Sequence, residues 1–390
     1  MLHWWTSPGE RRAADVLVAR LAEEGIRWRD AAIPGGAGVG AGKVLRSRVL
    51  AGDAPEATQM IGATIVEWAD TGLLLELDGV ARGGQWAQAL FPEVLRGVQH
   101  RGHVVAAPLG IHRINLLYVN LALFERHRLA VPRQWDDWAA AAQVLQQAGV
   151  VPLALSREPW QVTTLLEGLL LASGGPVLYR ALFSRLDARA AADPRFAEAL
   201  ARLRLAKAWA GADLTEQPWT RALERLRSGS AAMMVMGDWA KGELMAGGWN
   251  PGEHFACVPV PGTAGHHLYS VDTLTFFARD YAQAAAQERM AGALLAPALQ
   301  AEFNRAKGSV PVRRGLDAAA MDACARESYT LFARGGDALV PSLAHRMATG
   351  ESNKDAIVAE LHRFFVNDAL PVAEAQRRLA AVLRVLAPGG

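Results

Sequence analysis

Residues 2–10 read LHWWTSPGE, and this stretch sets the pattern for the first part of the chain. A short apolar run that stops at a Ser-Pro-Gly turn predicts a strand that ends abruptly. Glu10 then opens an amphipathic helix, with apolar residues at helical spacing up to Gly25. Successive side chains of a strand point to opposite faces, so Trp4 and Trp5 cannot both face one core. We expect at least one indole at the carboxyl end of the strand, where open α/β sheets bind ligands.

The same stretch suits the recognition of a sugar. A flat apolar ring stacks on the C–H faces of a sugar, and a carboxylate beside it accepts hydrogen bonds from hydroxyls. The alternative is purely structural: Trp4 and Trp5 begin a core strand, and Glu10 is a first-turn acid favoured by the helix dipole. Both interpretations are kept at this point.

The composition is that of a globular protein. The chain has 390 residues, enough for two or three domains, and is 51% hydrophobic and 21% charged. A net charge of +2 gives no electrostatic reason to expect nucleic acid or an anionic membrane as a partner. No apolar run approaches the roughly 20 residues of a membrane span. Met1 stands directly before the first strand, so the protein is cytoplasmic or a leader has been removed.

The sequence predicts neither a metal nor a cofactor. Cys257 and Cys324 match no zinc spacing and no CxxC pair, and they fit one disulfide or two buried thiols equally well. Residues 34–42 hold five glycines but lack a GK[ST] ending and a GxGxxG after a strand. We therefore interpret them as a flexible loop.

Strand-like and helix-like segments alternate along the chain, which predicts an α/β fold with a mostly parallel sheet and helices on both faces. Pro297 is expected to kink one long helix. No linker splits the chain, so two lobes tied by several crossing strands would explain its length. The expected strands are 26–33, 57–62, 104–108, 115–120, 151–155, 231–236, 255–261 and 270–278, and the helices are 43–50, 64–71, 135–149, 160–172, 194–209, 218–227 and 280–306, with two more starting near 352 and 371.

Four motifs carry a resemblance to a known family. They are HWWTS with Glu10 at 3–10, IHRIN at 111–115, MGDW at 236–239 and FNRAKGSVPVR at 303–313. In this order they make the chain similar, over nearly its whole length, to a periplasmic sugar-binding protein of an ABC importer. It most resembles the glucose-binding branch of extracellular solute-binding protein family 1.

The resemblance implies a type II periplasmic-binding-protein fold. In that fold each lobe is a mostly parallel sheet flanked by helices, and a multi-strand hinge joins the lobes around a cleft. The N-terminal lobe would be 1–108 plus 273–313, and the C-terminal lobe 109–272 plus 314–390. The protein would be a monomeric, non-catalytic receptor in the periplasm, its leader absent from this chain. It would bind a monosaccharide, a glucose-like hexose, by hinge closure and deliver it to membrane permease subunits.

The resemblance also implies two stacking platforms. Trp5, with Trp4 beside it, matches the platform of the first lobe, and Trp239 matches that of the second. Glu10 and Lys307 match residues that grip sugar hydroxyls, and the alternative for Lys307 is a solvated loop lysine. We expect the rings of Trp5 and Trp239 to face each other across the cleft, so a ring deep inside its own lobe would overturn the interpretation as a receptor.

Further candidates carry polar groups. Asp272 is an acid inside an apolar strand and needs a partner, which a sugar hydroxyl could be. His345 falls where relatives carry a ligand histidine, although a lone helical histidine is often structural. Asp238 could accept a hydroxyl, but capping the next helix is the better interpretation. His112 and Trp160 are expected to line the cleft.

One position departs from the glucose-binding pattern. Those relatives have a lysine before the glycine that matches Gly62, and this chain has Ile61. A lost charge-assisted bond costs roughly 1.5–3 kcal/mol. Either glucose binds more weakly, or the ligand lacks a polar group there, or Gln59 compensates. We therefore expect a monosaccharide and leave its identity open.

Two other functions fit parts of the sequence. Glu10 and Asp272 could form the carboxylate pair of a carbohydrate-active enzyme, although no glycosidase motif is visible. Alternatively, the ligand is a non-sugar polyol or an acidic solute. Lys307 would then pair with an anion, and affinity would fall with salt.

Overall fold

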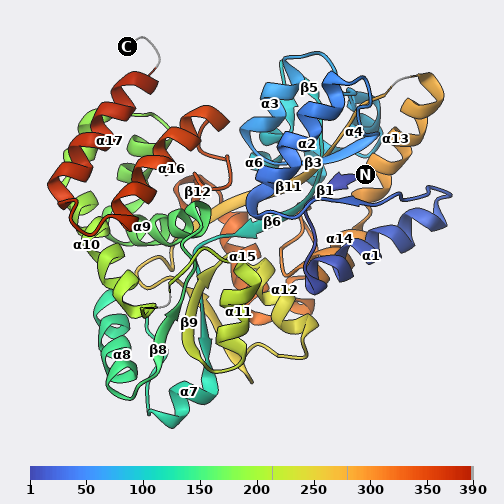
Figure 1. Ribbon diagram of the computed structural model, residues 1–390. Helices are drawn as coiled ribbons and strands as arrows, with labels where there is room; N and C mark the ends of the chain where they lie inside the picture. The colour runs from blue at the N-terminus through green and yellow to red at the C-terminus, as the bar shows by residue number, and fades with distance from the viewer. Residues whose placement is uncertain (213, 279, 388–390) are drawn as a thin grey trace. The chain divides into compact units, whose positions relative to one another are not determined.

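The computed structural model describes residues 1–212, 214–278 and 280–387 (Figure 1). The chain forms two compact units and passes between them five times, so neither unit is continuous in sequence. Unit 1 contains Met1–His112, Lys241–Gly247 and Ser270–Gly335, and unit 2 contains Arg113–Ala240, Gly248–Tyr269 and Gly336–Gly390. Neither Cys257 nor Cys324 is a free thiol.

The units differ from the predicted lobes in four segments. Residues 109–112 and 270–272, which we expected in the C-terminal lobe, belong to unit 1. Residues 314–335, which we expected in the C-terminal lobe, belong to unit 1, where the rings of Phe91 and Tyr329 lie 5.4 Å apart. Residues 241–247 belong to unit 1 as well, and the backbone N–H of Gly9 donates to Glu243 Oε2 at 2.7 Å. Long-range contacts of this kind leave no periodic signal in the sequence.

The sheet of unit 1 has the order β11-β3-β1-β2, with β6 also paired to β11. The pairs β1–β2 and β1–β3 are parallel, whereas β11 runs antiparallel to β3. The first three residues of β11 lie in unit 2 and pair there with β12 in parallel. The strand bounds are β1 Leu2–His3, β2 Ala31–Ala32, β3 Ala57–Met60, β6 Ala107–Arg113, β11 His267–Phe276 and β12 Leu339–Pro341.

The predicted first helix is confirmed as α1 (Pro8–Glu23), and a reciprocal cap fixes its start. Ser7 Oγ accepts the backbone N–H of Glu10 at 3.3 Å, and Glu10 Oε2 accepts the N–H of Ser7 at 3.2 Å. The apolar stripe of α1 is buried and packs along α14 (Pro297–Lys307), as Figure 1 shows.

Two further predictions for unit 1 differ from the structure. The expected helix 280–306 is two helices, α13 (Tyr281–Leu294) and α14, because Pro297 has no backbone N–H to donate and starts a new helix. The expected loop 34–42 already contains a 3-10 turn and the start of α2. The remaining elements are η1 Gly36–Gly38, α2 Val39–Leu50, α3 Ala63–Ala69, α4 Asp78–Gly83, α5 Trp86–Ala89, α6 Pro92–Gly97, β4 Gln99–His100, β5 His103–Val104, η3 Ala318–Ala320 and α15 Ala323–Arg334.

The sheet of unit 2 has the order β10-β7-β9-β8 and is mixed, which corrects the expectation of a mostly parallel sheet. Strand β7 is antiparallel to both β10 and β9, and only β8 and β9 are parallel. Strands β8 and β9 are connected by a long segment that contains several helices. Parallel neighbours need such a crossover, because the chain must return to the same end of the sheet. The strand bounds are β7 Leu116–Asn120, β8 Val151–Ala154, β9 Ala231–Met236 and β10 Phe255–Pro259.

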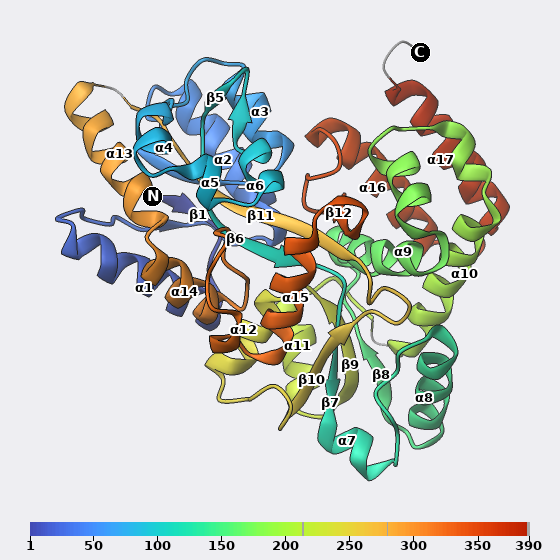
Figure 2. The same cartoon turned by 180° about the vertical axis from the view of Figure 1, so that it is seen from behind.

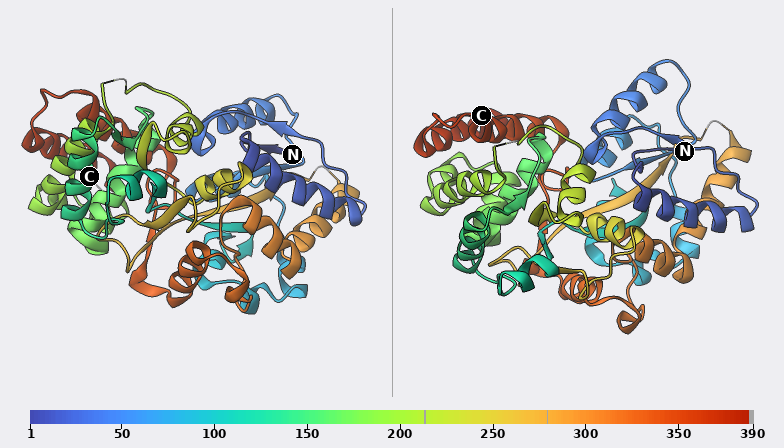
Figure 3. Two further views of the ribbon diagram at one scale, coloured as in Figure 1. Left: turned by 90° about the horizontal axis from the view of Figure 1, so that it is seen from below. Right: turned by 60° about the horizontal axis from the view of Figure 1, so that its bottom comes forward.

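Helices enclose a large apolar core in unit 2. The red α16 and α17 lie beside the green α9 and α10 in all views (Figures 1, 2 and 3). Helix α12 begins in unit 2 and continues in unit 1. The helix bounds are α7 Leu121–Arg126, α8 Trp135–Gln147, α9 Pro159–Phe183, η2 Ala188–Ala192, α10 Pro194–Trp209, α11 Trp219–Arg227, α12 Trp239–Ala246, η4 Gly336–Ala338, α16 Glu351–Val366 and α17 Val372–Leu386.

Helix α9 is long and apolar enough, by length and composition alone, to cross a membrane. However, 72% of its apolar window is buried inside the protein, as expected for a core helix. The helix is also interrupted near its predicted end, because Gly175 has φ 69° and ψ 179° and is followed by Pro176. α9 is therefore two packed helices meeting at a break.

Candidate functional site

Four of the predicted residues come together in unit 1, and we call Trp4, Gln59, His112 and Asp272 the Asp272 cluster. Asp272 Oδ1 accepts a hydrogen bond from Gln59 Nε2 at 3.0 Å, and its Oδ2 lies 3.2 Å from His112 Nε2. Gln59 Oε1 in turn accepts the backbone N–H of Trp4 at 3.3 Å. β11 pairs with both β3 and β6, and β3 also pairs with β1, which precedes Trp4, so the sheet itself assembles the cluster.

Asp272 is an ionised acceptor in this cluster. Its burial, with 5% of the residue exposed, acts to raise the pKa of the carboxyl. The charges of His112 and Lys307 and the hydrogen bonds from His112 and Gln59 outweigh burial, so the pKa of Asp272 lies below its ordinary value. The partner expected for a buried acid is thus supplied first by the protein's own donors.

Glu10 and Lys307 form a buried ion pair. Lys307 Nζ lies 3.2 Å from Glu10 Oε1, and Lys307 is only 3% exposed. The other carboxylate oxygen, Oε2, accepts the backbone N–H groups of Thr6 and Ser7. Lys307 is therefore the buried last residue of α14 and not a solvated loop lysine. Glu10 serves both in the cap of α1 and as the partner of Lys307.

The two adjacent indoles differ in exposure, which changes the expected platform. Trp5 is fully buried and packs inside unit 1 against His3 and Phe303, with ring centroids 5.2 and 5.8 Å away. A ring enclosed in this way offers no free face for stacking. Trp4 is half-buried and belongs to the Asp272 cluster. Trp5 is thus a core residue, and the expectation that it forms a platform opposite Trp239 is wrong. Trp4 becomes the candidate platform of unit 1.

Three predicted residues come together in unit 2, and we call Trp160, Trp239 and His345 the His345 cluster. The ring centroids of Trp239 and His345 lie 5.2 Å apart, those of Trp160 and His345 6.1 Å, and those of the two indoles 6.4 Å. Both indoles are half-buried and His345 is buried. The arrangement offers apolar ring surface beside an imidazole.

Comparison with known proteins assigns the family. Residues 6–296 match the family of bacterial extracellular solute-binding proteins. This chain belongs to that family. The solute-binding protein is 35% identical to a protein of Brucella suis biovar 1 (strain 1330) named "Probable sugar-binding periplasmic protein", over 98% of this chain and 91% of the relative. The match confirms the resemblance carried by the four sequence motifs.

Two more similarities are informative. The xylose/arabinose-binding protein XacG of Haloferax volcanii (strain DS2) is 28% identical over 286 residues, which are 71% of this chain and 60% of the relative. The solved structure of the bacterial solute receptor AcbH aligns with a TM-score of 0.83 over 99% of this chain and 98% of the receptor, at 16% identity. That likeness confirms the expected two-domain α/β fold.

Two buried polar residues of this solute-binding protein, Ser342 and Glu167, form a chain of hydrogen bonds that ends at His345. His345 Nδ1 lies 2.9 Å from Ser342 Oγ, and Ser342 Oγ donates to Glu167 at 3.1 Å. Glu167 is fully buried in α9 and also accepts from Tyr179 Oη and the N–H of Leu343. Burial raises the pKa of Glu167 to about 7, although each of these hydrogen bonds acts to lower it.

Asp238 and Ile61 are buried. Asp238 Oδ2 accepts the backbone N–H of Arg113 at 2.9 Å, and its own N–H donates to Arg113 O, so it fastens the end of β9 to the end of β6. Ile61 follows β3 and is 3% exposed. The position that departs from the glucose-binding pattern is thus an apolar core position in this protein.

Sequence reasoning missed two glycines that lie under the half-buried indoles of Trp4 and Trp239. A Cβ built on Gly38 would lie 2.8 Å from Cε3 and Cζ3 of Trp4, and one built on Gly237 would overlap the six-membered ring of Trp239. Gly237 stands in the MGDW motif, which was a usable signal. Gly38 lies in the loop interpreted only as flexible.

Sequence reasoning also missed Ser342 and Glu167. Glu167 did leave a signal, because it is the one acid in the apolar run 162–172. Ser342 is 175 residues away, and nothing in the local sequence links the two.

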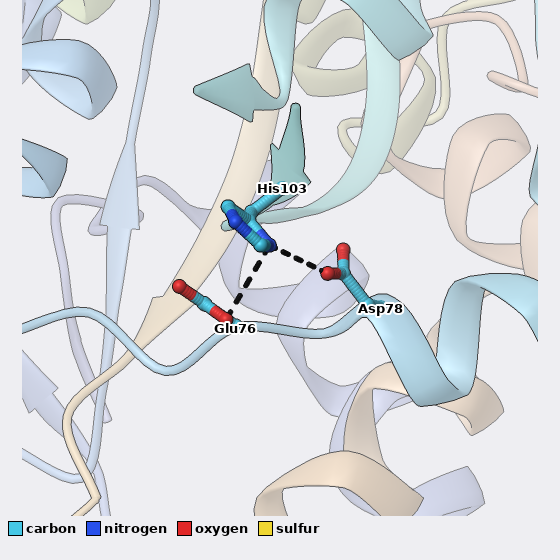
Figure 4. Close-up of side chains that lie close together, drawn as sticks. All are labelled: Glu76, Asp78 and His103. Carbon is cyan, nitrogen blue, oxygen red and sulfur yellow. Dashed lines mark hydrogen bonds and ion pairs between the residues drawn. The ribbon is translucent and has the colours of Figure 1, made fainter. Parts of the chain in front are cut away.

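Unit 1 also contains a mixed group of Glu76, Asp78 and His103 (Figure 4). His103 Nδ1 lies 2.7 Å from Asp78 Oδ2 and 3.4 Å from Glu76 Oε2, and the three ligand-type atoms lie within 4.8 Å of one another. The hydrogen bond to Asp78, followed by the charge of Glu76, raises the pKa of His103. An imidazole with a raised pKa between two carboxylates accounts for the group, and we assign no metal to it.

Proposed function

We propose that this solute-binding protein is the sugar-binding component of an ABC importer, that it works in the periplasm as a monomer, and that it delivers a monosaccharide to the permease. The observation that supports this most directly is the His345 cluster, in which two half-buried indoles lie beside a buried imidazole. In the Asp272 cluster the backbone N–H of the half-buried Trp4 is linked through Gln59 to the buried Asp272. Sugars present both C–H faces and hydroxyls, and these two kinds of group match them.

The relatives support a sugar as ligand. The similar protein of Brucella suis has a sugar-binding name, and XacG is named for xylose and arabinose. AcbH is described as having an exclusive preference for β-D-galactopyranose. The name of XacG favours a monosaccharide here, whereas the solved structures of this fold are described with ligands that range from β-D-galactopyranose to maltose and raffinose. Because Ile61 is apolar and buried, we expect glucose to be one hexose among several to test.

A binding role fits Asp272 and Glu10 better than glycoside hydrolysis does. A glycosidase acid needs a raised pKa so that it can deliver a proton near neutral pH. The pKa of Asp272 lies below its ordinary value. Both oxygens of Glu10 are engaged, one with Lys307 and one with backbone N–H groups. As an ionised acceptor, Asp272 suits hydroxyl recognition.

Titration calorimetry against a panel of hexoses, pentoses, disaccharides and an acidic solute tests the proposal. We expect at least one monosaccharide to bind with a dissociation constant far below 1 mM, with no product released on prolonged incubation with glycosides. The proposal fails if every sugar binds more weakly than about 1 mM, or if glycosides are turned over.

The variant Asp272→Asn tests the role of the carboxylate. It keeps the shape of the side chain but loses the charge, so we expect the affinity for the best sugar to fall by about tenfold or more. Asp53→Asn is the matched control, because Asp53 is exposed and its ion pair with Arg48 lies at the surface of the same unit. Equal affinities of wild type and Asp272→Asn would remove Asp272 from the proposed site.

A further inference from the structure

Glu158 occupies the N-cap of α9, but its side chain does not cap the helix. A capping side chain accepts the backbone N–H of the second or third helical residue, and Asn, Asp, Ser and Thr are the favoured types. In α9 these two residues are Trp160 and Gln161. Glu158 Oε2 instead accepts their side-chain donors, Trp160 Nε1 and Gln161 Nε2, each at 2.7 Å. The position that normally closes a helix thus holds two side chains.

The carboxylate of Glu158 is itself held in place by Gln161. Gln161 is buried, with 2% of the residue exposed, and its Nε2 also donates to Gln217 O at 3.1 Å. Because both hydrogens of this amide point at oxygen acceptors, the side chain of Gln161 is fixed. Ser156 Oγ fastens the same loop, since it accepts the backbone N–H groups of Glu158 and Gln217. The acceptor that Trp160 meets is therefore part of a network formed by the protein alone.

The bond from Trp160 Nε1 decides what the indole offers a ligand. An indole has one polar hydrogen and no acceptor, so a single bond to a carboxylate uses its whole hydrogen-bonding capacity. A bond at one edge of the ring also fixes the rotation of the side chain. The ring lies in the His345 cluster, with its centroid 6.1 Å from that of His345 and 6.4 Å from that of Trp239. Trp160 thus presents apolar ring surface to the cluster and no donor.

We propose that Glu158 is a positioning residue that locks the indole of Trp160, so that this side of the His345 cluster recognises a C–H surface of the ligand and not a hydroxyl. A ring that is ordered before the ligand arrives costs less entropy on binding. The inference rests on the proposed function for the nature of the ligand. The hydrogen bond between Glu158 and Trp160 belongs to the free protein and is tested without any sugar.

Nitrogen-15 NMR of the ligand-free protein tests this hydrogen bond. We expect the Nε1–H of Trp160, assigned by its loss in Trp160→Phe, to exchange with water at least about tenfold more slowly than that of free tryptophan. Glu158→Ala should remove the protection. Glu158→Gln should keep most of it, because the amide oxygen can take the place of Oε2. Rapid exchange in the wild type, or slow exchange in Glu158→Ala, would overturn the inference.

The variant Glu158→Asp separates the positioning of the indole from the stability of the fold. Aspartate is one methylene shorter and is a favoured N-cap, so it can accept a backbone N–H of α9 but no longer reaches the indole. We expect the urea midpoint of unfolding to be at least that of wild type, while sugar affinity falls by about fivefold. Wild-type affinity in Glu158→Asp would contradict the positioning role.

A double-mutant cycle tests whether Glu158 acts through the indole N–H. Trp160→Phe keeps an aromatic ring but has no donor. Glu158→Ala should weaken sugar binding by about fivefold in wild type and by less than about twofold in the Trp160→Phe background. An equal loss in both backgrounds would mean that Glu158 touches the ligand directly or supports the fold, and it would overturn the inference.

The single variants of Trp160 test the kind of surface that the ligand meets. Trp160→Phe should bind the best sugar within about fivefold of wild type, whereas Trp160→Ala should lose about tenfold or more, because the ring and not its donor meets the ligand. Equal losses would contradict apolar recognition. Glu125→Ala is the matched control, because Glu125 is an exposed acid of the same unit, and it should change neither indole exchange nor affinity. If no sugar binds but Glu158 protects the indole, the proposed function fails while the positioning of Trp160 stands.

Discussion

At the residue scale, two glycines let the candidate platforms lie where they do. Gly38 lies under the ring of Trp4, and Gly237 lies under that of Trp239. A side chain at either position would occupy the space of the indole. The position of each indole ring therefore depends on a neighbouring glycine, because any side chain there would occupy the space of the ring.

Gly237→Ala should displace the ring of Trp239. The new Cβ would overlap the six-membered ring, which must move away from its place 5.2 Å from His345. We expect the affinity for the best sugar to fall by at least about tenfold, measured by titration calorimetry. Gly265→Ala is the control in the same unit, since a Cβ there meets nothing within 4 Å. Wild-type affinity for Gly237→Ala would show that the ring position is unimportant.

Glu167 should make the stability of the protein depend on pH. Its pKa is raised by burial from 4.5 to about 7, so the folded protein holds this proton more tightly than the unfolded chain does. The contribution of Glu167 to stability is therefore fully present below about pH 4.5 and is lost as the pH rises through 7. Over this range we expect wild type to lose on the order of 3 kcal/mol relative to Glu167→Gln.

Denaturant unfolding at several pH values measures this loss, because the amide of Glu167→Gln does not titrate. The exposed Glu253→Gln in the same unit is the control and should follow the wild type. A constant difference between wild type and Glu167→Gln across the range would contradict the raised pKa.

At the element scale, α9 depends on the break at Gly175. The positive φ of this residue is one that side-chain-bearing residues adopt only with strain, and it lets two apolar helices pack in one core. Gly175→Ala should lower the free energy of unfolding by about 1–3 kcal/mol, although a Cβ there would meet no atom within 4 Å.

A glycine-to-alanine substitution inside a regular helix should instead raise the free energy of unfolding. Gly42 lies inside α2 without a positive φ, and a Cβ there also meets nothing within 4 Å. Gly42→Ala should raise the free energy of unfolding by up to about 1 kcal/mol. Urea unfolding of both variants checks the pair, and equal changes would show that backbone conformation does not decide the effect.

At the scale of the whole molecule, neither unit is a continuous segment. The sheet of unit 1 takes β11 from residues more than 200 positions after β3, and α1 packs on α14 from the same late part of the chain. Each unit can therefore complete its core only when most of the chain has been made.

A fragment of residues 1–112 should not fold on its own. It contains β1, β2 and β3 but lacks β11 and α14, which leaves an unpaired sheet edge and an uncovered face of α1. We expect little helix by circular dichroism and no cooperative unfolding in urea, in contrast to the full chain. A cooperative transition in the fragment would mean that the missing elements are dispensable for unit 1.

Much of the secondary structure could be predicted from the sequence, because its determinants are local. The helix that Glu10 opens, the strand 231–236 and the helix 194–209 follow from periodicity and turn chemistry. Strand direction in unit 2 could not be predicted, because apolar periodicity is the same for parallel and antiparallel pairing. Three of the seven residues of the two clusters, Trp4, His112 and Trp239, lie in the four motifs, and the motifs did not reveal the partners of these residues.

The sequence by itself determined the family, the two-domain α/β fold and a set of candidate residues, since motif order and apolar spacing are properties of the chain. Only the tertiary structure decided that Trp5 belongs to the core and Trp4 does not, and that Glu167 acts behind His345. The physical reason is that exclusion from solvent and hydrogen bonding depend on segments that meet only after folding. Ser342 and Glu167 are 175 residues apart in the sequence and 3.1 Å apart in the fold.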